Sequence, residues 1–300
     1  MPDNISTNRS ALTLPHELSQ EIIQTARAQS AIMQLARRVT LPGRGLDIPT
    51  ITGDPEAQWV SETDRKPVTN PGVGMKVMKG YTLAVIVPFS NQFRRDLPGL
   101  YDNIVARLPG ALAQKFDQTV MGVVSAPGEN FDTLKDATAQ SLVSSSTYDG
   151  LVAADTDIAE HNGLLSGFGL SPAARGILLG AVDKNERPLF VNSVADGAIP
   201  RILGVPAYYG RGLYKAGTST TPAVVGVAGD WTQAMYGMVE DINISFSDQA
   251  SLTTVDGDGQ TVVINLWERN MFAVRAEFEV GFIANKSVFN LLTGATTAAA

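Results

Sequence analysis

LDIPTITGDPEAQWVSETDRKPVTNPGVGMKVMKGYTLAVIVPF (residues 46–89) and WERNMFAVRAEFEVGFIANKSVFNLLT (residues 267–293) are the most informative stretches of this sequence. The first contains two strand-like arms, joined by a long polar segment rich in Pro and Gly. The second alternates as a strand does, although charged residues lie inside it. A two-stranded arm cannot bury its own surface, so it needs a neighbour. The sequence therefore favours a protein that assembles over one that catalyses.

The composition permits a sizeable core and excludes several kinds of chemistry. A chain of 300 residues suits one large domain or two ordinary ones. With 44% hydrophobic and 18% charged residues, wholesale disorder is not expected. The absence of cysteine removes disulfides, thiolate nucleophiles and Cys-based zinc sites, and it fits folding in a reducing cytoplasm. We expect no cofactor.

The start of the chain and the charge balance narrow the partners. The polar start, MPDNISTNRS, has no apolar region of a secretory signal. The longest apolar run, residues 83–89, is far shorter than the roughly 20 residues of a membrane helix, so we expect a soluble protein with no membrane partner. The net charge is −7, whereas a protein that grips nucleic acid through its phosphates needs a dense basic face.

Helix and strand patterns alternate along the first half of the chain. A helix is predicted from Leu14 to Arg27, with apolar residues at a spacing of four. Residues 81–89 alternate as a strand, and Asp96 can cap a second, long helix with Pro98 in its first turn. Pro109 predicts a bend or break in this helix, and Gly122 marks its end. Its apolar stripe comprises Leu100, Ile104, Leu108, Leu112, Phe116 and Val120.

The second half of the chain predicts shorter elements. Residues 125–146 indicate a crossover with at most one short strand, and helices are predicted over residues 148–161 and, with Ser171 as the cap, up to Val182. The predicted strands are residues 163–170, 189–191, 205–207, 224–227, 238–244, 261–267 and 271–283, with a hairpin turn at residues 256–259. This order predicts an α+β protein with a discontinuous domain, in which the end of the chain pairs beside the base of the front hairpin.

An enzyme is the alternative from a different class. The sequence has two histidines, His16 and His161, and neither is accompanied by a G-x-S-x-G elbow or by metal-ligand spacing. The glycine groups lack the spacings of phosphate-binding loops. A hydrolytic enzyme is therefore a remote alternative, and we do not expect catalysis.

A series of short motifs carries a resemblance to a known family. In chain order they are Ala57, Trp59, Val60 and Glu62 followed by Lys66 and Pro67; Phe116 and Asp117 followed by Gly122; Asp183, Arg187, Pro188 and Leu189; Gly204 and Pro206; Gly229, Asp230 and Trp231; residues 273–277 (AVRAE); and Ala284 with Phe289. In this order they resemble the major capsid proteins of tailed bacteriophages, the HK97-fold family. Glu186 stands where the family usually has Gly, so that turn can differ.

The resemblance implies an α+β, HK97-like capsid fold with four regions. They are an N-terminal arm (1–45), an extended E-loop hairpin (46–80) that lies over a neighbouring subunit, a discontinuous P domain with a long spine helix (81–134 and 261–300), and a central A domain (135–260). Hexamers and pentamers of the subunit would self-assemble into an icosahedral shell. The shell would enclose the double-stranded DNA of a tailed phage without sequence-specific binding.

The resemblance also implies a location and a set of partners. The subunit would assemble in the host cytoplasm and remain in the virion as a structural protein of the head. A portal protein is an expected partner, and a decoration protein is left open. Only about 45 residues precede the E-loop, too few for a fused scaffolding segment, so a separate scaffolding protein, or none, is expected. An encapsulin-type bacterial nanocompartment shell is the second alternative, and the packaged contents would distinguish the two.

Six residues are predicted to contact neighbouring subunits: Trp59, Glu62, Arg65, Lys66, Arg275 and Glu277. Trp59 would anchor the loop as buried aromatic residues do at interfaces, unless it is a local staple inside its own loop. Some relatives join Lys to Asn covalently with the help of Glu, and Lys66, Asn270 and Glu277 have compatible spacing. The alternative is that Lys66 is a solvated cation, Asn270 a turn residue and Glu277 an ion-pair partner of Arg275 or of another subunit.

Overall fold

The computed structural model describes most of the chain. The described residues are 28–51, 57–62, 65–66, 68, 72–96, 98–144, 146–182, 185, 187, 189–190, 201–255 and 259–296. The helix predicted from Leu14 to Arg27 lies outside them, as do most of the N-terminal arm and residues 256–258 of the predicted hairpin turn.

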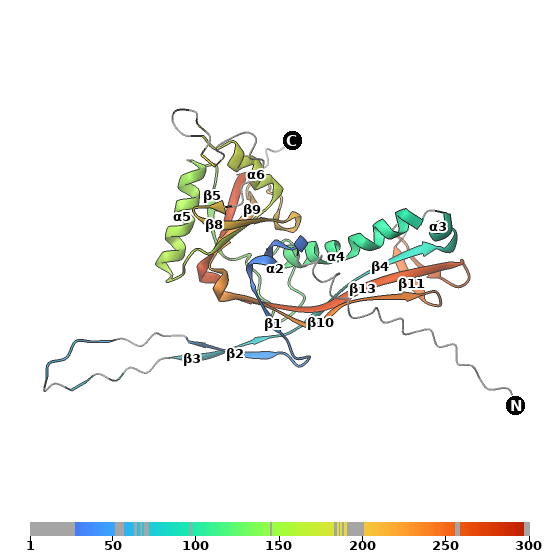
Figure 1. Ribbon diagram of the computed structural model, residues 1–300, viewed down its shortest axis with the longest axis horizontal. Helices are drawn as coiled ribbons and strands as arrows, with labels where there is room; N and C mark the ends of the chain where they lie inside the picture. Colours follow the sequence, from blue (N-terminus) through green and yellow to red (C-terminus); the bar gives the residue numbers. More distant parts are fainter. Residues whose placement is uncertain are drawn as a thin grey trace.

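Two sheets and two hairpins organise the molecule (Figure 1). The four-stranded sheet has the order β1 (Arg37–Thr40), β10 (Ala234–Ser247), β13 (Met271–Ala284) and β4 (Tyr81–Ser90). The six-stranded sheet has the order β5 (Thr138–Ser141), β14 (Phe289–Thr296), β9 (Pro222–Gly229), β6 (Gly167–Leu170), β8 (Val205–Tyr209) and β7 (Arg201–Ile202). The two hairpins are β2 (Leu46–Ile51) with β3 (Val73–Met78), and β11 (Ser251–Val255) with β12 (Thr261–Asn265).

Short and long helices connect these strands. They are α2 (Ala31–Leu35), α3 (Asn91–Asp96), α4 (Pro98–Val120), α5 (Thr147–Glu160) and α6 (Pro172–Leu179), with the 3-10 turns η1 (Arg211–Leu213), η2 (Trp231–Gln233) and η3 (Lys286–Val288). Ser171 accepts a hydrogen bond from the Ala174 amide and caps α6 as predicted. Asp96 is the last residue of α3 and bonds its neighbour Arg95, so the sequence-based assignment of Asp96 as the start of a new helix missed α3.

The long strand β13 is the centre of the four-stranded sheet. It pairs antiparallel with β10 on one side and with β4 on the other, which confirms that the end of the chain returns beside the front of it. The predicted alternation of β4 is also confirmed, since exposed and less exposed residues alternate from Tyr81 to Val87. β10 is longer than the predicted strand at 238–244, because it pairs with β13 from Ala234 to Ser247, beyond both predicted ends.

The front hairpin differs from its prediction. Its return arm is β3, which pairs with β2 from Leu46↔Met78 to Ile51↔Val73, whereas β4 leaves for the main sheet. The separation falls at Gly80, where a Cβ atom would lie 2.7 Å from the Glu279 carboxylate and 2.8 Å from the Val239 side chain. A side chain at this position would collide with β10 and β13, so only glycine lets the chain pass from β3 to β4 at this point.

Helix α4 lies along the four-stranded sheet as a single element. Its stripe is buried from Leu108 through Leu112 and Phe116 to Val120, whereas Leu100 near its start is exposed. Of the bend or break predicted at Pro109, the break is wrong, because α4 runs uninterrupted from Pro98 to Val120, and the bend stays a prediction. Proline removes one backbone hydrogen bond, but the buried residues on either side hold both halves against the same core.

Gly122 ends α4 as predicted. It has φ +68°, its amide donates to the Thr119 carbonyl at 3.1 Å, and the Val123 amide donates to the Gln118 carbonyl at 2.9 Å. This pair of bonds is the Schellman arrangement, which satisfies the last carbonyls of a helix and favours glycine.

The two largest clusters of buried apolar residues lie on the two sheets. The larger contains α4 residues with β10 and β13, and the second lies between α5, α6 and the six-stranded sheet. On β14 the neighbouring residues Leu291 and Leu292 point into different clusters, as alternating residues of a strand do. By strand pairing, β14 belongs to the six-stranded sheet and β10 to the four-stranded one. The sheets thus divide the chain differently from the predicted boundaries at 135, 260 and 261.

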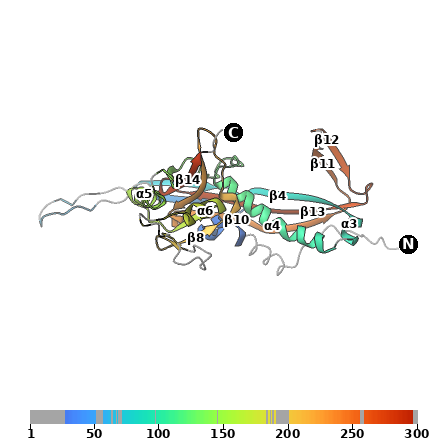
Figure 2. The ribbon, with the colours of Figure 1, turned by 90° about the horizontal axis from the view of Figure 1, so that it is seen from above.

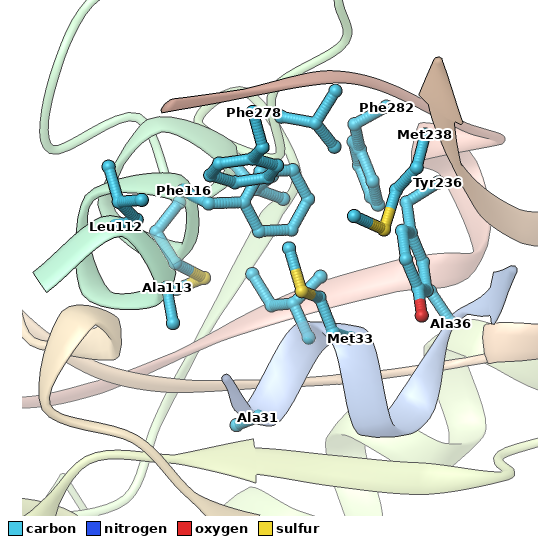
Figure 3. Close-up of a cluster of buried hydrophobic side chains, with 14 of the residues drawn as sticks. Ala31, Met33, Ala36, Leu112, Ala113, Phe116, Tyr236, Met238, Phe278 and Phe282 are labelled. Carbon is cyan, nitrogen blue, oxygen red and sulfur yellow. The ribbon is translucent and has the colours of Figure 1, made fainter. Parts of the chain in front are cut away.

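Helix α2 closes the larger cluster from the side of the N-terminal arm. Figure 3 shows Met33 pointing toward Phe116 of α4 and Ala36 beside Tyr236 of β10, with Ala31 at the start of the helix. All five residues are buried. The short helix is thus held by tertiary packing, since five residues are too few for a helix that is stable alone.

Candidate assembly surface

The hairpin of β2 and β3, together with the described residues between them (57–62, 65–66, 68 and 72), is called the β2–β3 ribbon here, and it exposes large apolar side chains. It projects from one end of the molecule along the longest axis (Figure 1). The exposed fractions of Trp59, Val68 and Met75 are 105%, 83% and 69%. An isolated two-stranded hairpin is at best marginally stable in water, and exposed apolar patches on a soluble protein mark interaction sites. The ribbon therefore has the composition of a surface that is covered by something else.

The four predicted contact residues of the ribbon are all solvent-facing. Trp59, Glu62, Arg65 and Lys66 are exposed, and none makes a hydrogen bond or ion pair with another described residue. The full exposure of Trp59 contradicts the alternative that it is a staple inside its own loop. Their role between subunits stays a prediction.

The two predicted contact residues of β13 already have partners in the same chain. Arg275 and Glu277 face the same side of the strand, and an Arg275 Nη2 atom lies 2.9 Å from the Glu277 Oε1 atom. The Arg275 Nε atom also donates to the Ser245 hydroxyl at 3.2 Å. This is the ion pair that the sequence left open as the alternative, and a contact with a second copy would have to share it.

Asn270 is part of a turn that joins two ends of the sheet. Its φ is +52°, and its side-chain oxygen accepts a hydrogen bond from the Asn91 amide group at 2.7 Å. Figure 1 shows α3, which begins at Asn91, at the end of the molecule opposite the β2–β3 ribbon. Asn270 therefore lies at the end of the molecule opposite β2 and β3. Glu277 is also roughly 20 Å from Asn270 at the 3.3 Å rise of a strand.

A buried carboxylate joins the N-terminal arm to the long helix. The Ser30 hydroxyl, which caps α2, donates to Asp117 of α4 at 2.6 Å, and the Ala31 amide donates to the same carboxylate at 3.2 Å. Asp117 is 1% exposed. Burial raises the pKa of Asp117 to about 7, against the hydrogen bonds from Ser30 and the α2 amides, which lower it.

The segment around η1 is the third element at this junction. A Cβ atom on Gly212 would lie 2.7 Å from the Asp117 Cβ atom and 2.5 Å from the Gln114 carbonyl oxygen, so η1 lies directly on α4. One feature of the sequence points to this site, namely a carboxylate beside Phe116 in an apolar helical stripe. Asp117 was recognised in sequence only as part of a motif, and its partner Ser30 was missed.

Asp230 forms a second polar junction beside Trp231. Its carboxylate accepts hydrogen bonds from the Leu164 amide, from the Thr232 amide and hydroxyl, and from the Gln233 side chain. Burial raises the pKa of Asp230, but these hydrogen bonds outweigh it and hold the pKa below its ordinary value. The Trp231 ring packs edge-on against Phe289 with centroids 5.0 Å apart, and its Nε1–H donates to the Gly167 carbonyl at 3.0 Å. The G-D-W motif thus joins β6, β9 and β14.

Membrane-spanning helices and clusters of metal ligands are absent from the described part of the chain. Its helices include none with both the length and the apolar character of a membrane span. Within the same residues, no three His, Cys, Asp or Glu side chains gather as metal ligands would. The features that remain are the exposed apolar side chains of the β2–β3 ribbon and the two buried polar junctions at Asp117 and Asp230.

This combination of a bare ribbon and a well-packed body is typical of a subunit that is completed by its neighbours. Residues 10–291 match the Phage capsid family, and the chain belongs to this family. It is 28% identical over 287 residues to the "Probable major capsid protein gp17" of Mycobacterium phage D29, covering 91% of this chain and 86% of that protein. It is 22% identical to the "Major capsid protein" of Staphylococcus phage 80alpha, covering 98% and 89%.

Solved structures have the same fold. A chain of Mycobacterium phage Adephagia matches with a TM-score of 0.71 at 22% identity, covering 90% of this chain and 91% of that one. The "Capsid of native GTA particle computed with C5 symmetry" matches with a TM-score of 0.60 at 16% identity, covering 99% and 95%. The predicted α+β, HK97-like capsid fold is confirmed.

Proposed function

We propose that this protein is a major capsid protein whose hexamers and pentamers close into the icosahedral head shell around the double-stranded DNA of a tailed phage. The observation that carries the proposal is the β2–β3 ribbon, which leaves Trp59, Val68 and Met75 exposed in the single chain. Laid over a second copy, the ribbon would bury these side chains at many identical interfaces, and weak contacts repeated around a closed shell act together.

The four-region organisation is part of this proposal. The β2–β3 ribbon is the E-loop, α4 with the four-stranded sheet forms the P domain, and the six-stranded sheet with α5 and α6 forms the A domain near the five-fold and six-fold centres. Residues 1–45 are the N-terminal arm. Sheet membership supports moving β10 to the P domain and β14 to the A domain, relative to the boundaries drawn from sequence.

The partners follow from the same proposal. The chief partner is the protein itself, in a shell that is assembled in the host cytoplasm and kept in the virion. A portal protein and a separate scaffolding protein complete the set, and a decoration protein stays open. Family membership supports a structural role, and we infer that the protein is not an enzyme. The family match favours the phage capsid over the encapsulin-type compartment and over a hydrolytic enzyme.

Electron microscopy of the purified protein tests the proposal. We expect negatively stained samples to show closed shells of uniform diameter, because every copy carries the same ribbon and the same acceptor surface. Shells from infected or expressing cells should contain DNA when the other head proteins are present. A protein that stays a compact monomer in every buffer contradicts the proposal, and shells that package an enzyme would instead support the compartment.

Covalent crosslinking is not expected to accompany assembly. The Asn270 side-chain oxygen is bonded to Asn91, and the Glu277 carboxylate that would accept a proton from Lys66 is paired with Arg275. We therefore expect a single band at 31.8 kDa when mature particles are boiled in detergent and run on a denaturing gel. A ladder of multiples, absent from a Lys66→Arg variant, would show the bond.

A further inference from the structure

The root of the β2–β3 ribbon is held by a small cluster of its own. Its fully buried members are Leu41, Met78 and Ile283, and four further apolar residues pack partly against them: Leu46, Ile48, Met235 and Val239. The cluster is separate from the two large ones. Met78, the last residue of β3, is 0% exposed and is the point at which the ribbon enters the body.

Two glycines let Met78 lie directly against the main sheet. A Cβ atom on Gly281 of β13 would lie 2.9 Å from the Met78 Cγ atom, and one on Gly237 of β10 would lie 2.8 Å from its Cε atom. These contacts fix where the ribbon is attached. Apolar contacts are not directional. A cluster of this size therefore does little to fix the direction in which the ribbon points.

An ion pair of Lys76, two residues before Met78 on β3, fixes the direction of the ribbon. The Lys76 ammonium group contacts the Asp132 carboxylate and donates to the Ala284 carbonyl at 2.8 Å. Asp132 is itself fixed on the end of β13, because its carboxylate accepts from the Ala284 amide at 3.0 Å and its amide donates to the Phe282 carbonyl at 3.0 Å. Lys76 therefore connects the returning strand, β3, to a fixed point on the body of the molecule.

We propose that the Lys76–Asp132 pair is a latch that sets the direction of the β2–β3 ribbon, and that Lys76 is a positioning residue for shell assembly. The inference rests on the proposed function, because direction matters only if the ribbon must reach a second copy. Met78 and Lys76 hold the ribbon at two separate points, which resists rotation about either one. A small rotation at the root grows along the ribbon, since each strand residue adds roughly 3.3 Å.

The first test replaces Lys76 by Met, which keeps an apolar stem and removes the charge. We expect Lys76→Met to raise the subunit concentration at which shells form about fivefold, the factor that corresponds to losing an ion pair of about 1 kcal/mol. We also expect a wider spread of particle diameters by electron microscopy, because ribbons of variable direction allow variable angles between subunits. Hydrogen exchange should quicken at residues 46–51 and 73–77 of the unassembled subunit.

Two variants control for changes that have nothing to do with the latch. Lys79→Met removes a neighbouring exposed lysine whose side chain makes no ion pair or hydrogen bond with the described residues, and it should assemble as the unaltered protein does. Lys76→Arg keeps the charge and should restore the concentration threshold and the narrow diameter distribution. Asp132→Asn removes the negative charge of the same ion pair, and its assembly should resemble that of Lys76→Met.

The outcomes separate this inference from the proposed function. If the unaltered protein forms shells and Lys76→Met forms the same shells at the same concentration, the latch is refuted and the capsid function stands. The same holds if Lys79→Met is as defective as Lys76→Met. If the unaltered protein forms no shell under any condition, the capsid function itself fails. An equal loss of thermal stability in Lys76→Met and Lys76→Arg would assign Lys76 to folding and overturn the positioning role.

Discussion

Trp59→Ala is expected to abolish shell formation at concentrations where the unaltered protein assembles completely. An aromatic anchor at the centre of an interface typically contributes about 2–4 kcal/mol, which is a loss of roughly thirtyfold or more per contact. The loss recurs at each copy around the shell. Folding should not change, because Trp59 is fully exposed in the single chain and has no packing to lose. Sedimentation and electron microscopy at a series of protein concentrations measure the effect.

A matched variant on another hairpin controls for the loss of any exposed tryptophan. Trp267 follows β12 and is 70% exposed, and Figure 2 shows the β11–β12 hairpin standing at the end of the molecule away from the ribbon. Trp267→Ala should reduce assembly less than Trp59→Ala, and Trp59→Phe should retain most of it. Shells of Trp59→Ala at the usual concentration would remove Trp59 from the interface.

The second large effect is expected at the buried carboxylate of Asp117. Asp117→Ala leaves the Ser30 hydroxyl and the Ala31 amide without their acceptor inside the core, and each such buried group costs about 1–3 kcal/mol. We expect the free energy of unfolding of the unassembled subunit to fall by about 3 kcal/mol. Denaturant titration followed by circular dichroism measures this fall. The control is Asp136→Ala, which removes an exposed carboxylate.

The pH dependence of Asp117 has a definite sign. Its pKa is raised from 3.8 to about 7 in the folded protein, so folding is favoured by this group below pH 3.8 and the benefit is lost as the pH rises through 7. Between pH 5 and pH 8 the loss of stability amounts to about 3 kcal/mol, because 1.36 kcal/mol is lost per pH unit only up to the folded-state pKa of about 7. Asp117→Asn cannot ionise, so its stability relative to the unaltered protein should rise over this interval. A constant difference between the two proteins would contradict the raised pKa.

The periodic elements follow from local patterns in the sequence. β4 and β13 alternate, and the stripe of α4 repeats every four residues, because which face a residue occupies depends only on the geometry of its own strand or helix. Ser171 and Gly122 act at helix ends through bonds to residues within five positions. The resemblance of the ordered motifs to capsid proteins was confirmed by the family match.

Pairing choices between elements do not follow from such patterns. An alternating strand can pair with any suitable neighbour, so the sequence did not distinguish β3 from β4 as the partner of β2. It also predicted no strand at Phe289–Thr296 and assigned residues 261–300 together to one domain, whereas β14 joins the six-stranded sheet. Pro109 stays helical because buried residues on both sides outweigh a local preference.

By itself, the sequence determined the period of the main elements, the helix-end roles of Ser171 and Gly122, the long polar hairpin and the family to which the chain belongs. Only the tertiary structure decided that Trp59 is bare, that Asp117 meets Ser30 across 87 residues of chain, and that Lys76 reaches Asp132. The physical reason is range. Periodicity and capping act within a few residues, whereas burial, ion pairing and pKa depend on which distant segments fold against one another.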